Sequence, residues 1–102
     1  MTSNPLKEEV LKLNKDYLYF MNRIQEADVS PSAVLVYRTL LDYANRSTWS
    51  CFPSINTIAK KTKLNRRTVI RQINILEREG LILKIPRQRK NKGNTSNMYF
   101  FD

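Results

Sequence analysis

The chain has no histidine and a single cysteine, and these absences remove several classes of active site. Histidine is the commonest general base and metal ligand, and one cysteine can form neither an internal disulfide nor a zinc site. With only two glycines, the chain has no glycine-rich phosphate-binding loop. We therefore expect no catalytic residues, no metal and no cofactor, and we predict a protein that is not an enzyme.

Long apolar runs are also absent, and none approaches the ~20 residues that span a bilayer. The N-terminal segment carries Glu8 and Glu9 and lacks the profile of a signal peptide. The lone thiol of Cys51 suits a reducing compartment. These features predict a cytoplasmic protein with no membrane partner, and nothing in the sequence indicates a small-molecule ligand.

Acidic residues are scarce in one third of the chain. Residues 60–92 contain twelve of the 18 lysines and arginines but only Glu77 and Glu79 among the nine acidic residues, which gives this range a net charge of +10. The rest of the chain sums to −1, so the overall charge of +9 is concentrated in one region. Segregation of this size indicates a polyanionic partner, and nucleic acid is favoured over an anionic membrane surface.

Two helices are predicted from their start signals before residue 63. Ser30 and Pro31 form an N-cap and a first helical residue, and this helix should run to about Asn45. Ser54 begins a second helix that ends near Thr62. The residues expected to be buried in the first helix are Val34, Tyr37, Leu40, Leu41 and Ala44; those in the second are Ile55, Ile58 and Ala59.

A third helix has the clearest boundaries in the sequence. Asn65 is its predicted N-cap, and it should run to Glu79. Gly80 then supplies a left-handed residue, after which Leu81 can pack back on Leu76 as in a Schellman motif.

Two short strands are predicted after this helix, over 81–86 and 95–101, with a polar basic loop between them. In the first strand we expect Leu81, Leu83 and Ile85 to share one apolar side. Residues 49–52 are too few for more than a loop or a brief strand. The aromatic residues expected in the core are Tyr37, Tyr43, Trp49, Phe52, Tyr99 and Phe101.

The N-terminal range 5–24 has apolar residues at alternating spacings of four and three, which is a heptad pattern. Three interpretations stay open: a helix packed on its own domain, a helix that pairs two copies in a homodimer, or a short strand at Tyr17–Met21 followed by a helix. We therefore divide the chain into an N-terminal segment, 1–28, and a main domain, 29–102. The residues of the heptad pattern are Leu6, Val10, Leu13, Tyr17, Phe20 and Ile24.

The range Ile55–Ile82 resembles a winged helix-turn-helix core, carried by the turn Thr62-Lys63-Leu64, the cap Asn65 and the ending Gly80-Leu81-Ile82. Together with Ser30-Pro31, Phe52-Pro53-Ser54 and Thr95–Tyr99, it is similar to the helix-turn-helix domains of plasmid and phage replication-initiation proteins and of related bacterial regulators. The resemblance covers about residues 29–101 and implies a mainly α fold with a small β-hairpin wing. Lys63 departs from the family pattern, because glycine is usual at this position of the turn.

The third helix is the predicted recognition helix. Val69, Ile73 and Leu76 form an apolar stripe for the core, whereas the arginines lie on another face. Because the N-terminal turns of such a helix reach deepest into the major groove, we expect base contacts from Arg66, Arg67, Arg71 and Gln72. The alternative for the arginines is a solvated helix face with ion pairs, which the lack of acidic residues before Glu77 disfavours.

Phosphate contacts are expected around the start of the second helix, where free amides favour an anion. Ser54 can also be a plain N-cap, and Thr68 can equally be a packed side chain. The phosphate-binding candidates are Ser54, Thr57, Lys60, Lys61, Asn65 and Thr68; the wing candidates are Arg87, Arg89, Lys90 and Lys92. A lysine-rich loop can alternatively serve only to keep a hairpin end soluble.

The sequence therefore predicts sequence-specific binding of double-stranded DNA without catalysis. A transcriptional regulator and a replication-initiator module fit equally well, and the alternative class is a winged helix used for protein or RNA contact. The target sequence, the oligomeric state and the direction of regulation are not predicted, nor whether the chain is a fragment of a longer protein.

Overall fold

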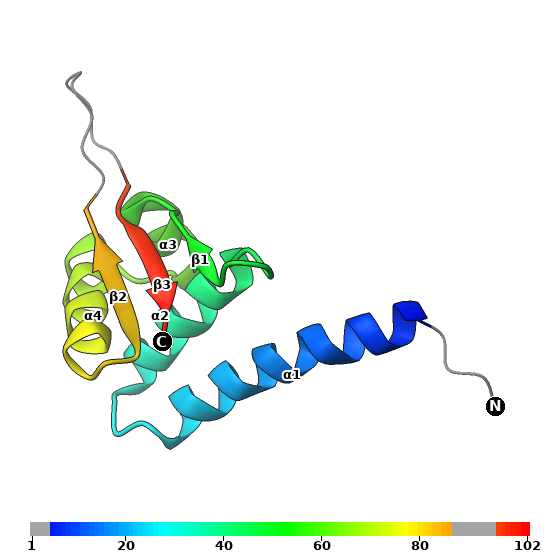
Figure 1. Ribbon diagram of the computed structural model, residues 1–102. Helices are drawn as coiled ribbons and strands as arrows, with labels where there is room; N and C mark the ends of the chain where they lie inside the picture. The colour runs from blue at the N-terminus through cyan, green and yellow to red at the C-terminus, as the bar shows by residue number, and fades with distance from the viewer. Residues whose placement is uncertain (1–4, 87–95) are drawn as a thin grey trace.

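The computed structural model describes residues 5–86 and 96–102, with the backbone alone for residues 5–14. Within these described ranges, four helices and three strands follow one another. They are α1 (Pro5–Glu26), α2 (Pro31–Tyr43), β1 (Ser50–Cys51), α3 (Ile55–Thr62), α4 (Arg66–Arg78), β2 (Ile82–Ile85) and β3 (Met98–Phe101). The small sheet covers one side of α2, α3 and α4, and α1 leads away from them (Figure 1). The prediction of a mainly α fold with a small β element is confirmed.

Helix α1 is continuous from Pro5 to Glu26, so the alternative of a short strand at Tyr17–Met21 is wrong. Phe20 and Ile24 are buried in the common core, and Tyr17 and Met21 pack against it. The C-terminal half of α1 therefore packs on its own domain. The N-terminal half points away from the other elements (Figure 1), and pairing of two copies through residues 5–24 stays a prediction.

Helix α2 lies at the centre of the molecule and packs against α1, α3, α4 and β1. It begins as predicted, because the Ser30 side chain accepts a hydrogen bond from the backbone N–H of Ala33 and Pro31 takes the first helical position. Tyr37, Leu40 and Leu41 are buried on its inner side. The prediction for Tyr43 was wrong: at the last position of the helix its ring is 40% exposed.

The sheet has the order β1-β3-β2, with both neighbours antiparallel to β3. The predicted sidedness of β2 was wrong, because Ile82 is buried whereas Leu83 and Ile85 are 54% and 42% exposed. Leu81 is buried as part of the ending of α4, before the strand begins. The first inward-facing residue of β2 is therefore Ile82, one residue later than predicted. A one-residue change of phase reverses the side on which every residue of a strand lies.

Aromatic rings connect α1, α2 and the sheet. Phe20 lies 5.0 Å from Trp49 and 5.4 Å from Phe101 between ring centroids, and Phe101 also meets the Tyr37 ring at 5.1 Å. Tyr37 is fully buried, yet its hydroxyl has no hydrogen-bond partner among the described residues. The prediction that Phe52 belongs to the core was wrong, because 57% of this residue is exposed after β1.

Candidate nucleic-acid interface

The turn between α3 and α4 sets the start of the recognition helix. Lys63 takes a left-handed conformation with φ 62°, the conformation expected where this turn usually has glycine. The Thr62 hydroxyl donates to the Ile58 carbonyl at 2.7 Å and accepts from the N–H of Leu64 at 3.3 Å, which satisfies backbone groups of the turn. Two residues after Lys63, the Asn65 side chain accepts from the N–H of Thr68 at 2.7 Å and caps α4 as predicted.

The other end of α4 is closed by a Schellman motif. The N–H of Leu81 donates to the Leu76 carbonyl and the N–H of Gly80 donates to the Glu77 carbonyl, both at 3.0 Å. Gly80 has φ +75°, a region that costs other residues conformational energy. The two ends of the helix therefore match the sequence prediction within one residue.

One side of α4 is buried in the core through Val69, Ile73 and Leu76. Gln72 lies on the same side and is only 7% exposed, and the Ser30 hydroxyl donates to its amide oxygen at 3.2 Å. The prediction that Gln72 contacts a base is therefore contradicted by its position. Its amide instead connects α4 to the N-cap of α2.

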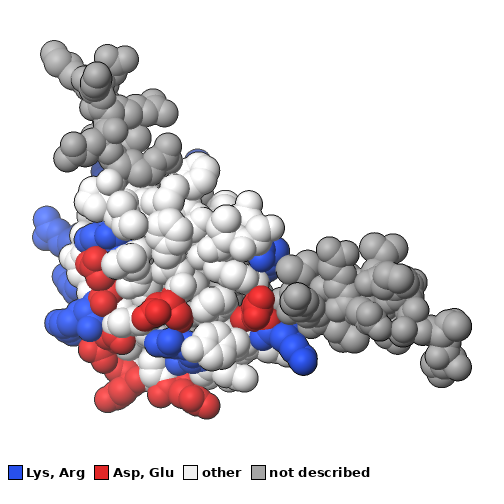
Figure 2. All heavy atoms as spheres, in the orientation of Figure 1, with Lys and Arg blue, Asp and Glu red and all other residues white. Residues whose placement is uncertain are grey.

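The opposite side of α4 carries Arg66, Arg67 and Arg71, all of which are exposed. Among the described residues, none of these guanidinium groups forms an ion pair or hydrogen bond. The first acidic residue of the helix is Glu77, and its partner is Lys84 at 3.7 Å. In the view of Figure 2, basic side chains line the edge that α4 forms, and the acidic side chains lie mainly across the middle and the lower part of the molecule.

A hollow of about 250 Å³ lies where α3, α4 and β3 meet. At its α3 side, the Ser54 side chain accepts from the N–H of Thr57 at 3.0 Å and lies 2.9 Å from the Thr57 hydroxyl. Sequence reasoning did not name Asn56, Ser96 and Asn97 as site residues, because the contact of Asn56 with the segment at 96–97 is distant in sequence. Its complete lining is Ser54, Ile55, Asn56, Arg66, Ser96, Asn97 and Tyr99.

The remaining phosphate candidates have different surroundings. Lys60 and Lys61 are exposed in the last turn of α3. Thr68 is half-buried, and the side-chain oxygen of Asn65 is used in the cap. The four wing candidates, Arg87, Arg89, Lys90 and Lys92, lie outside the described residues.

Burial favours the protonated forms of two groups near this surface, the Cys51 thiol and the Tyr99 hydroxyl. Burial raises the pKa of the Cys51 thiol to about 12. Burial also raises the pKa of the Tyr99 hydroxyl, and a hydrogen bond with Asn97 opposes this effect. In the described part of the chain, acidic and cysteine side chains nowhere gather in threes to hold a metal ion. Over residues 5–86 and 96–102, the helices lack an apolar stretch that would cross a lipid bilayer.

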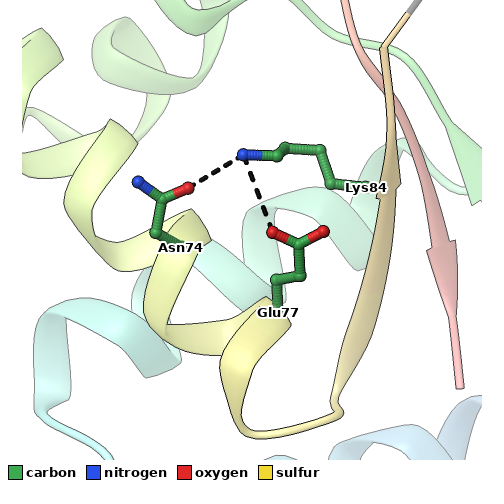
Figure 3. A network of polar contacts seen from close by, with 3 residues as sticks. All are labelled: Asn74, Glu77 and Lys84. Atoms are coloured by element: carbon green, nitrogen blue, oxygen red, sulfur yellow. Dashed lines mark hydrogen bonds and ion pairs between the residues drawn. The ribbon is translucent and has the colours of Figure 1, made fainter.

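A polar network connects α4 to the strand that leads toward the predicted wing (Figure 3). The ammonium group of Lys84 in β2 donates to Asn74 Oδ1 at 2.9 Å and lies 3.7 Å from Glu77 Oε1. Lys84 is on the inward side of β2, opposite Tyr99 in the register of the sheet. The network therefore links β2 to the third and last turns of α4.

Comparisons with known proteins agree with this arrangement. A sequence model of the helix-turn-helix domain family matches residues 27–82, more than half of the chain. No curated protein matches the chain. Among solved structures, NMB1585, a MarR family regulator from Neisseria meningitidis, is similar with a TM-score of 0.50 and 19% identity, over 98% of this chain and 63% of that one. The chain thus spans less than two thirds of that regulator, and the likeness concerns the fold. The chain belongs to the helix-turn-helix domain family and has the winged helix-turn-helix fold of DNA-binding proteins.

Proposed function

We propose that this protein binds specific sequences of double-stranded DNA, with α4 in the major groove, and that it acts without catalysis. The observation that carries the proposal is the exposed set of Arg66, Arg67 and Arg71, which have no acidic partner among the described residues. Guanidinium groups that lie on one helix face without acidic partners repel one another, and an anionic ligand relieves this repulsion.

The geometry of α4 suits the major groove. Its 13 residues span roughly 20 Å at ~1.5 Å per residue, and an α-helix fits the groove of B-form DNA. Arg66 and Arg67 occupy the first turn, and Arg71 follows one turn later on the same side as Arg67. In this proposal they approach base edges, where an arginine that binds guanine through two hydrogen bonds contributes ~1–3 kcal/mol of discrimination.

The hollow beside Arg66 suits a phosphate of the same DNA. The N-terminal amides of α3 begin there, and the Ser54 hydroxyl, which lies 2.9 Å from the Thr57 hydroxyl, is part of its lining. Lys60, Lys61 and Thr68 are proposed to contact neighbouring phosphates, and Asn65 to contribute through the capped end of α4. These contacts position the protein on the duplex without reading sequence.

The wing is proposed to contact the same duplex. Ile85 at the end of β2 pairs with Met98 at the start of β3, so the two strand ends on either side of residues 87–95 lie next to each other. Ser96 and Asn97, which precede β3, line the hollow together with Arg66. The root of the wing therefore lies next to the start of α4, and we propose that Arg87, Arg89, Lys90 and Lys92 bind backbone or the minor groove.

For the biological role we propose a transcriptional regulator or a replication-initiator module, with residues 29–102 binding DNA and residues 1–28 supplying a pairing segment. The similar fold of a MarR family regulator supports the first role, and the Ser30-Pro31 and Phe52-Pro53-Ser54 motifs support the second. A homodimer through residues 5–24 would place two copies of α4 on half-sites about one helical turn apart.

The test is selection of bound duplexes from a random pool, with Arg67→Ala and Arg71→Ala beside the unaltered protein. Arg38→Ala is the matched control, because Arg38 is an exposed arginine on α2, next to Leu35 and Asp42 and outside the proposed interface. We expect a defined motif whose discrimination relaxes in the two α4 variants and stays unchanged in the control. Equal enrichment of all duplexes would contradict sequence-specific binding, and a palindromic motif would support the dimer.

A further inference from the structure

An apolar side chain stands in the middle of the basic face of α4. Ile70 is 43% exposed, although the other isoleucine, valine and leucine residues of this helix are buried or half-buried. At about 100° per residue, Ile70 falls between the lines of Arg66 and Arg67 on the helix surface. At this position Ile70 contributes little to the core, and its side chain cannot form a hydrogen bond or an ion pair with a phosphate. It can contact an apolar group of a base in the DNA groove.

Asn74 lies one turn after Ile70 on the same exposed side of the helix. Its amide has one fixed orientation, because Lys84 Nζ, which can only donate, lies 2.9 Å from Oδ1. Figure 3 shows the amide oxygen turned toward Lys84 and the amide nitrogen turned away from it. Ile70 and Asn74 therefore offer an apolar surface and a hydrogen-bond donor beside each other.

We propose that Ile70 and Asn74 together recognise a thymine in the major groove, an inference that rests on the proposed function. Thymine is the base whose major-groove edge presents a C5-methyl group and, beside it, the O4 acceptor. Ile70 contacts the methyl group and the Asn74 amide donates to O4. Adenine would need both amide atoms directed at the base, but the oxygen is directed at Lys84. Cytosine presents a donor where Asn74 requires an acceptor.

Two modified bases separate the two contacts. After selection has defined the motif, each of its thymines is replaced in turn by one of two bases. Uracil keeps O4 and lacks the methyl group. 5-Methylcytosine, paired with guanine, keeps the methyl group and has a hydrogen-bond donor in place of O4. At the recognised thymine, we expect uracil to weaken binding about three- to fivefold. We expect 5-methylcytosine to weaken it about five- to tenfold.

The variants should lose these preferences separately. Ile70→Ala is expected to bind thymine and uracil equally while still rejecting 5-methylcytosine, and Asn74→Ala is expected to do the reverse. Leu35→Ala is the control, since Leu35 is an apolar residue of α2 with a similar exposure of 41%, and it should keep both preferences. Thermal unfolding of each variant checks that it is folded, which the exposure of both residues leads us to expect.

The possible failures are distinguishable. A pool without any enriched motif refutes the proposed function and this inference together. An enriched motif in which uracil binds as tightly as thymine at every position refutes the thymine inference alone. Equal losses on uracil substitution in the unaltered protein and in Ile70→Ala would show that another residue contacts the methyl group, and would also overturn it.

Discussion

Truncation of Ile24 tests the docking of α1 on the domain. The Ile24 side chain is fully buried among core residues that come from α2 and the sheet as well as from α1. Substitution of a fully buried isoleucine by alanine costs ~2–5 kcal/mol, depending on how far the surrounding side chains collapse. We expect Ile24→Ala to lower the free energy of unfolding by about 3 kcal/mol, which corresponds to a fall in Tm of about 12–20 °C for a chain of this size.

The assay is urea and thermal unfolding followed by circular dichroism, with Leu18→Ala as the matched control. Leu18 lies on the same helix, six residues earlier, and is 56% exposed, so its truncation should change the free energy of unfolding by less than ~0.5 kcal/mol. If the two variants were equally stable, α1 would not be docked through Ile24. A second copy would then be the better candidate for the partner of the whole heptad face.

Four further predictions follow from particular groups. If six to eight phosphates are neutralised, the logarithm of the binding constant should fall with the logarithm of the salt concentration at a slope of about −5 to −7, measured by fluorescence anisotropy, and a much shallower slope would refute the proposed footprint. Tyr37→Phe should leave the Tm unchanged or raise it slightly, because the buried hydroxyl has no partner among the described residues; a loss above about 1 kcal/mol would reveal a missed hydrogen bond. Burial raises the pKa of Cys51 from 9.0 to about 12, so its contribution to stability is complete below pH 9 and is lost between pH 9 and 12; urea unfolding across this range should show a steeper loss in the unaltered protein than in Cys51→Ala. Lys84→Met should destabilise the protein by about 1 kcal/mol, because it removes the hydrogen bond to Asn74 and a partly exposed ion pair, and an unchanged Tm would show that this network contributes nothing.

The features that could be predicted from the sequence are those that depend on neighbouring residues. The caps Ser30, Ser54 and Asn65 each bind an N–H three residues later, so their signal lies within one helical turn. The ending of α4 at Gly80 is local in the same way. For this reason the boundaries of α4, and the exposed side that carries its arginines, follow from the sequence pattern.

The features that could not be predicted depend on residues distant in sequence. Gln72 lies three residues after Val69 and four before Leu76, so helical spacing already places it on the buried side. Only its partner Ser30, 42 residues earlier, could not be predicted. Leu83 lies on the exposed side of β2 because the strand begins one residue later than the apolar pattern suggests. The hollow beside Arg66 combines residues of α3 with Ser96 and Asn97, and no sequence spacing relates these segments.

The order of the strands has a consequence for synthesis of the protein. β3, the last strand along the chain, lies between β1 and β2, which do not pair with each other. A nascent chain that has completed α2, α3, α4 and β2 still lacks β3, which is the hydrogen-bond partner of both β1 and β2. Their edges remain open to other chains until the ribosome has released residues 98–101. A stop codon shortly before Met98 would therefore abolish the sheet, remove the buried Tyr99 from the core and favour aggregation.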